Sequence, residues 1–259
     1  AAIVSMGFTD SVATMIAGRD DPVVGATEQG LESLKGNGTS RLYFTEKKTA
    51  APIAAWINGA AAHAMDYDDV SMLGHPSAVL MPAILAEAEE TGATGKDMVA
   101  AYIAGFEIWG ELVFREQGSH RTRGWHPTGI MGTLAAAAAC CVLHKLDVEQ
   151  TQNALGIAAS QSSGLTSNFG SMVKPFHAGH AAFAGIMAAR YAMAGMVASE
   201  DSIEHASGFL SAVSENGNYD CDTPADQLGT DWHILKRKLS IKRYPVCYGT
   251  HRIIDATLA

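Results

Sequence analysis

The chain has 259 residues and a formal net charge of -9, with 47% hydrophobic and 17% charged residues. A chain of this length can bury a large core, and this composition excludes a disordered protein. The acidic balance argues against a nucleic-acid partner, because the sequence shows no basic stripe with interleaved aromatic residues. We also expect no membrane partner, since Lys145 interrupts the best apolar run before it reaches the roughly 18 residues that a span requires.

The hydrophobic pattern predicts a chain built mainly of helices. Residues 8–17 are expected to form a short buried helix, and residues 22–34 an amphipathic one that begins at Pro22. A turn at 36–39 then leads into a short strand over 40–45. Further helices are predicted over 50–65, 77–91, 96–115, 128–145, 147–162 and 175–197, with glycine-containing breaks at 92–95, 118–124 and 164–170.

The four cysteines show neither a CxxC pair nor the spacing of a zinc finger. Cys140 and Cys141 are adjacent within an apolar helix, where we expect them to be small core residues. Together with the lack of a recognisable signal peptide in residues 1–17, this usage predicts a reducing, cytoplasmic location.

An acid cluster at residues 66–70 (DYDDV) is followed closely by GHPS at residues 74–77. The apolar stripe of the preceding helix ends at Met65, and Pro76 opens the next helix, so the cluster lies at a junction between two helices. His75 and the carboxylates could then face a cleft and exchange protons with a ligand. The alternative is a solvated, acidic helix end with a capping aspartate.

Three further junctions repeat this pattern. Their sequences are GWHPTG with His126, VKPFHAGH with Lys174, and IKRYPVCY with Lys242. Proline fixes its own φ and restricts the residue before it, so a neighbouring side chain is displayed in a limited range of directions.

The order of these motifs resembles the MmgE/PrpD family, and the resemblance runs from residue 5 to the end of the chain. Its members include 2-methylcitrate dehydratases, cis-aconitate decarboxylases and iminodisuccinate epimerases. The resemblance implies an all-α fold, with residues 1–241 forming a helical domain that is incomplete at its N-terminus. Residues 242–259 would begin the crossover into an α/β lid domain that is largely missing, so we expect the chain to be a fragment of a longer enzyme.

The family's chemistry implies removal of a proton α to a carboxylate of a small polycarboxylic acid, without a metal or other cofactor. Such an enzyme needs cations to stabilise the developing enediolate and a base with a suitable pKa. The positions that match the family's motifs are Asp66, His75, His126, Lys174 and Lys242. The resemblance assigns the two lysines to substrate carboxylates, the two histidines to proton transfer, and Asp66 to orienting a base or a substrate hydroxyl.

Five other residues are judged by their place in or near these motifs. His177 matches the family's KPxH pattern and is a candidate for substrate binding, whereas His63 and His180 are expected to be core or packing residues. Decarboxylase-like members carry a threonine and a histidine where this chain has Val70 and Cys247. We therefore expect a carbon-oxygen lyase similar to 2-methylcitrate dehydratase, while an epimerase or a decarboxylase remains open. Cys247 is either a substituted substrate-binding group or a small buried residue.

Two other functions stay open. Asp66, Asp68, Asp69 and His75 could bind a hard divalent ion in a metal-dependent hydrolase, although that gives no reason for two lysines beside prolines. The chain could also be a catalytically inactive helical module. We expect a homodimer formed through alanine- and glycine-rich helices such as 128–143.

Overall fold

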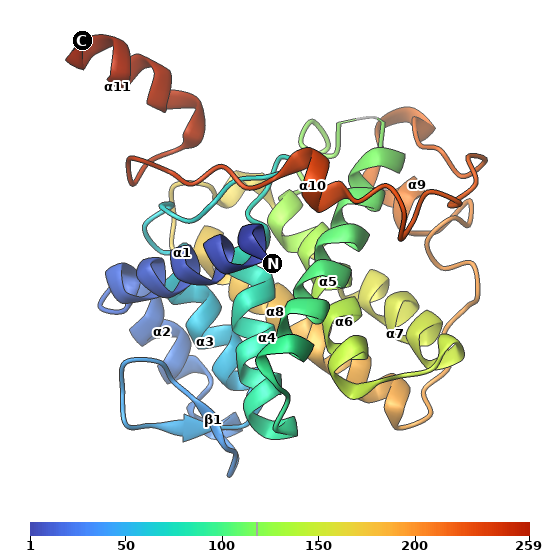
Figure 1. The fold of residues 1–259 in the computed structure, drawn as a ribbon, viewed down its shortest axis with the longest axis horizontal. Helices are drawn as coiled ribbons and strands as arrows, with labels where there is room; N and C mark the ends of the chain where they lie inside the picture. Colours follow the sequence, from blue (N-terminus) through green and yellow to red (C-terminus); the bar gives the residue numbers. More distant parts are fainter. Residues whose placement is uncertain (118) are drawn as a thin grey trace.

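The computed structural model describes residues 1–117 and 119–259 and is built almost entirely of helices (Figure 1). This confirms the predicted all-α fold. The main helices are α1 (Ala2–Gly18), α2 (Pro22–Gly30), α3 (Ala51–His63), α4 (Pro76–Thr91), α5 (Gly95–Arg115), α6 (Pro127–His144), α7 (Val148–Gln161) and α8 (Val173–Met193). Shorter ones follow as α9 (Phe209–Val213), α10 (His233–Arg237) and α11 (His251–Leu258), with 3-10 turns η1 (Glu32–Leu34), η2 (Thr166–Asn168), η3 (Glu215–Gly217) and η4 (Tyr248–Thr250).

The boundaries differ most from the prediction near the N-terminus. The first helix begins at Ala2 rather than at residue 8, and the second ends at Gly30 before the separate turn η1. The predicted strand is reduced to β1 (Ser40–Arg41), which pairs in antiparallel fashion with β2 (Lys48–Thr49). Gly118, where the second predicted break starts, lies outside the described residues.

Helix α6 forms the centre of the core and packs on α4, α5, α7 and α8. It is 18 residues long and apolar enough to cross a membrane by length and composition alone, but 89% of it is buried inside the fold. The sequence argument that no apolar run reaches this length was therefore wrong, because the helix ends before Lys145. Cys140 and Cys141 are both buried in it, as predicted.

Helices α3 and α8 cross at unusually close range. A Cβ on Gly179 would lie 2.1 Å from the backbone oxygen of Trp56, and one on Gly59 would lie 2.7 Å from the Cα of Gly179. Only glycine allows this approach, because the clashing atoms belong to the backbone and cannot move aside. The crossing brings the C-terminal end of α3 and the N-terminal end of α8 to the same side of the molecule, where the acid cluster also lies.

The last segment runs over the helical body before α11 projects away from it (Figure 1). A backbone pair anchors this segment, since the N–H groups of Val70 and Ser240 each donate to the other's carbonyl at 2.9 Å. The pair places Lys242 beside the acid cluster although the two are far apart in sequence. The division into a domain over 1–241 and a crossover over 242–259 stays a prediction.

Candidate active site

The two histidine-proline junctions are the first turns of two core helices. His75 is the N-cap of α4 and His126 the N-cap of α6, each followed by proline at the first helical position. Proline suits that position because its φ matches the helix and its missing N–H would have had no partner there. The two imidazoles are therefore displayed at helix N-termini, beside the acid cluster.

Asp66 is the meeting point of two lysines from distant parts of the chain. Its Oδ1 lies 2.9 Å from Lys174 Nζ and 2.7 Å from Lys242 Nζ. Lys242 also donates to the backbone carbonyl of Asp66, a residue with a left-handed φ of 47°. The structure thus joins three of the predicted site residues in one ion-pair cluster.

Burial and the neighbouring positive charges shift the pKa of Asp66 in opposite directions. Burial raises the pKa of its carboxyl, but Lys174, Lys242 and His75 outweigh this effect and lower the pKa from 3.8 to about 2. Lys174 stands in the first turn of α8, where the helix dipole disfavours a cation, so the Asp66 carboxylate explains its position. The Lys174 ammonium also lies 5.6 Å from the ring centre of Phe169.

A second acid, Asp68, lies between two histidines. Its carboxylate accepts a hydrogen bond from His63 Nδ1 at 2.9 Å and lies 2.9 Å from His75 Nδ1. Burial raises the pKa of Asp68, but the two imidazoles hold it well below its usual value. Burial lowers the pKa of His63 to about 4, so His63 is neutral at physiological pH.

His126 and His177 form a second imidazole pair, with their Nδ1 atoms 3.1 Å apart. Burial is the main cause that lowers the pKa of both residues, to about 4 for His177 and further for His126. Both are neutral at physiological pH, so one ring donates the shared proton and the other accepts it. Gly164, at φ 124°, lets the rings approach, since a Cβ there would lie 3.2 Å from His177.

The structure brings Asp66, His75, His126, Lys174 and His177 into one cluster, which Lys242 joins through its ion pair with Asp66. The ring of His63 links the two histidine pairs, because its centre lies 4.5 Å from that of His75 and 6.0 Å from that of His126. Their roles in catalysis remain predictions. His180 packs against Trp56 and Phe176, in agreement with the packing role expected of it.

Cys247 lies apart from this cluster. Its thiol is exposed, and the described contacts connect it to Thr250 through its backbone oxygen rather than to the lysine or histidine groups. The alternative of a small buried residue was wrong. As a substrate-binding residue, Cys247 stays a prediction that the geometry does not support.

Sequence reasoning missed the part that His63 and Asp68 play together. His63 was interpreted as a core histidine, and it is indeed buried, but it donates to a carboxylate of the candidate site. The available signal was its position at the last turn of a helix, five residues before Asp68. Five residues across a helix end do not fix whether two side chains meet, so the pair required the tertiary structure.

A metal ion bound at the acid cluster would be repelled by the lysines that are already there. His63, Asp66, Asp68 and His75 each offer a ligand atom, all within 4.8 Å of one another. Imidazole and carboxylate groups suit several divalent ions. However, two ammonium groups already bind Asp66, and a cation would have to displace or repel them.

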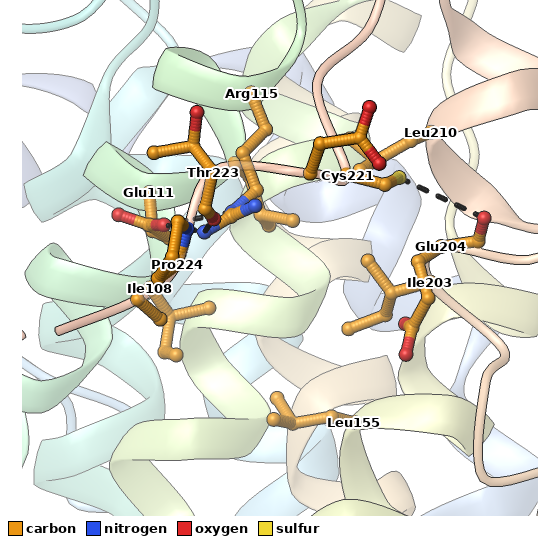
Figure 2. Close-up of a pocket in the computed structure, with 13 residues that line it drawn as sticks. Ile108, Glu111, Arg115, Leu155, Ile203, Glu204, Leu210, Cys221, Thr223 and Pro224 are labelled. Carbon is orange, nitrogen blue, oxygen red and sulfur yellow. Dashed lines mark hydrogen bonds and ion pairs between the residues drawn. The ribbon is translucent and has the colours of Figure 1, made fainter.

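A separate hollow of about 400 Å³ lies beside α5, away from this cluster. It is lined by side chains such as Ile108, Arg115, Leu155 and Cys221, and the Cys221 thiol donates to the backbone carbonyl of Glu204 (Figure 2). None of its lining residues belongs to the cluster of lysines, acids and histidines. The candidate site is therefore defined by its charged groups rather than by this hollow.

Comparison with known proteins gives a consistent result. The model of the MmgE/PrpD N-terminal domain matches residues 2–222. The chain is 31% identical over 209 residues to cis-aconitate decarboxylase from Homo sapiens, covering 78% of this chain and 43% of that protein. It is 29% identical over 242 residues to cis-aconitate decarboxylase from Aspergillus terreus, covering 88% and 49%. A cis-aconitate decarboxylase-like protein from Aspergillus oryzae is 26% identical over 263 residues, covering 95% and 54%.

The chain thus spans about half the length of the relatives that it matches. The match of the family model extends over most of the chain and includes the acid cluster, both histidine-proline junctions and Lys174. This chain belongs to the MmgE/PrpD family.

Proposed function

We propose that the full-length protein is a cofactor-independent lyase that removes a proton α to a carboxylate of a small polycarboxylic acid. The observation that supports this most strongly is the Lys174–Asp66 ion pair beside the imidazole of His75. It places a cation, which can hold a substrate carboxylate, next to a group that can accept a proton.

The two lysines have different surroundings and, we propose, different tasks. The side chain of Lys242 is fully buried and bonds both the carboxylate and the backbone carbonyl of Asp66, so it holds Asp66 in place. Lys174 is 15% exposed and can turn from Asp66 toward an incoming carboxylate. This modifies the expectation from the sequence, in which both lysines bind substrate.

His75 is the proposed base. Its Nε2 lies 3.6 Å from Asp66 Oδ1, too far for a hydrogen bond, so that nitrogen is free to approach the substrate. His126 and His177, both neutral and deeper in the site, would donate hydrogen bonds to the developing enediolate or to the leaving group. The charge that forms on the substrate is then balanced by Lys174.

For the overall reaction, we propose dehydration of a 2-methylcitrate-like hydroxy acid. The base takes the α-proton, the carbon-carbon double bond forms, and the β-hydroxyl leaves as water after receiving a proton. Val70 of the acid cluster supports this choice, because the resemblance to the family places a threonine there in decarboxylase-like members.

Decarboxylation of cis-aconitate is the second candidate. It is favoured by the names of the relatives described above, which share up to 31% identity with this chain. In that reaction the carbon-carbon bond to one carboxylate breaks, carbon dioxide leaves, and the carbanion accepts a proton.

The test is an assay of the full-length protein with 2-methylcitrate, citrate and cis-aconitate, in buffer with and without a chelator. Proton NMR would follow the acids in deuterium oxide, and released carbon dioxide would be measured separately. We expect an unsaturated product and solvent deuterium exchange, both insensitive to the chelator. Activity that depends on an added metal ion would contradict the proposal and favour a hydrolase.

An inactive helical module makes a different prediction. It would show neither turnover nor deuterium exchange, and these acids would leave its thermal melting temperature unchanged. Stabilisation by one of the acids, together with its turnover, would exclude this alternative.

A further inference from the structure

Asp68 has no contact with solvent and lies between the two imidazoles of His63 and His75. Its Oδ1 accepts the hydrogen bond from His63 Nδ1, and its Oδ2 lies 2.9 Å from His75 Nδ1. Burying a carboxylate fully destabilises the folded protein unless nearby groups form hydrogen bonds or ion pairs with it. These two imidazoles are the groups that face it.

The two histidines differ in what they can do with this charge. His63 is fully buried, and burial lowers its pKa to about 4, so it donates a neutral hydrogen bond and leaves the negative charge of Asp68 uncompensated. The side chain of His75 is 13% exposed, and its other nitrogen lies 3.6 Å from Asp66 Oδ1. The charge of Asp68 therefore acts on His75.

The contact between Asp68 and His75 determines which nitrogen of the His75 ring carries the proton. With Asp68 next to Nδ1, that nitrogen carries the proton and Nε2 presents its lone pair to the site. In the free protein Nδ1 lies within hydrogen-bond distance of the Asp68 carboxylate, but the angle does not meet hydrogen-bond geometry, so this buried nitrogen has no hydrogen-bond partner. Such alignments commonly tighten when the substrate binds.

We propose that Asp68 is the positioning residue of the candidate site: its buried carboxylate fixes the His75 tautomer and stabilises the positive charge that His75 gains on taking a proton. The catalytic consequence rests on the proposed function. The tautomer itself does not, so the two can be tested separately.

Asp69 offers a matched control. It is also fully buried, but its carboxylate bonds the Ser77 hydroxyl, which in turn contacts the Tyr102 hydroxyl at 2.7 Å, away from the histidines. Burial raises its pKa to about 8, so the carboxyl is mostly protonated at neutral pH and replacing it with asparagine changes the charge little. Both substitutions alter a buried aspartate of the same cluster, but only one alters His75.

The kinetic test compares Asp68→Asn and Asp69→Asn in the full-length protein at neutral pH. In Asp68→Asn, the new carboxamide has one acceptor oxygen, which His63 uses, so its NH₂ group faces His75 and favours the wrong tautomer. We expect kcat to fall by about two to three orders of magnitude with KM changed by less than about threefold. Asp69→Asn should stay within about threefold of the unaltered protein in both constants.

The second test needs no substrate. Nitrogen-15 NMR of labelled histidine reports which ring nitrogen of His75 carries the proton. We expect Nδ1–H in the unaltered protein and in Asp69→Asn, and a shift toward Nε2–H in Asp68→Asn.

An unaltered protein with Nε2–H, or an Asp68→Asn protein with unchanged tautomer or unchanged kcat, would overturn the inference. If no acid is turned over by the unaltered protein, the proposed function fails, while the NMR comparison still decides the role of Asp68. If Asp68→Asn does not fold, the tautomer in the unaltered protein decides alone.

Discussion

At the scale of single residues, the charged groups of the site are largely buried and closely paired. Asp66 binds two ammonium groups, and Asp68 serves two imidazoles. These charged groups lie close together, so a substitution at one position should change the electrostatics of the whole cluster.

Lys174→Ala should reduce turnover of the substrate by about a hundredfold or more in the full-length protein, because a preorganised cation is removed from a developing anion. The fold should survive, since the removal also relieves an unfavourable cation at a helix N-terminus. Steady-state kinetics and circular dichroism would measure the two effects. Lys96→Ala, which removes an exposed lysine from the first turn of α5, is the control. Full activity of Lys174→Ala, or loss of its fold, would show that Lys174 is structural.

Asp69 should make the protein less stable as the pH rises. The folded chain keeps the proton on this buried carboxyl up to about pH 8, whereas the unfolded chain releases it near 3.8. The contribution of Asp69 to the free energy of unfolding therefore decreases as the pH rises from about 3.8 to about 8, and it is constant above that range. Asp69→Asn removes the ionisation, so its melting temperature relative to the unaltered protein should rise by about 3 °C or more between pH 5 and pH 8.5.

Calorimetry at several pH values would measure this difference. Asp20→Asn, at an exposed aspartate, should show no such trend. A difference between Asp69→Asn and the unaltered protein that is the same at pH 5 and pH 8.5 would mean that Asp69 is ionised throughout.

At the scale of helices, close packing rather than charge sets the geometry. Gly179→Ala should destabilise the protein by about 1–3 kcal/mol, because the added methyl group meets the Trp56 carbonyl and the backbone of Ala60. Urea unfolding would measure the loss. Gly25→Ala is the matched control, since a Cβ at this helical position meets nothing within 4 Å. Equal stability of the two variants would mean that α3 and α8 can separate without cost.

The elements show what a sequence can and cannot predict. The starts of α4 and α6 were predictable because proline at the first turn leaves a local signature. The short helices α10 and α11 were not, since five to eight residues give too few turns for a periodic pattern.

In the site, Asp66, His75, His126 and Lys174 could be selected from motifs. The burial of Lys242 could not, because Lys242 reaches the cluster only after folding. The pairing of Asp68 with His63 could not either, because it depends on how the chain turns after the end of α3.

At the scale of the molecule, the predicted homodimer needs a surface other than the one first suggested. Residues 128–143 lie in α6, which is buried among the other helices. We still predict a dimer of the full-length protein, and light scattering at micromolar concentration would measure its mass. A monomer under these conditions would contradict the prediction.

The bridge that Asp66 makes between two lysines also affects how the substrate arrives. In the free protein the carboxylate of Asp66 is paired with Lys174, so under the proposed function a substrate carboxylate would compete with Asp66 for this cation. A chain with a net charge of -9, in which Asp66 partly offsets the charge of the two site lysines, exerts little long-range attraction on an anion. Capture should therefore be an exchange of one carboxylate for another at short range, and added salt should weaken it only modestly.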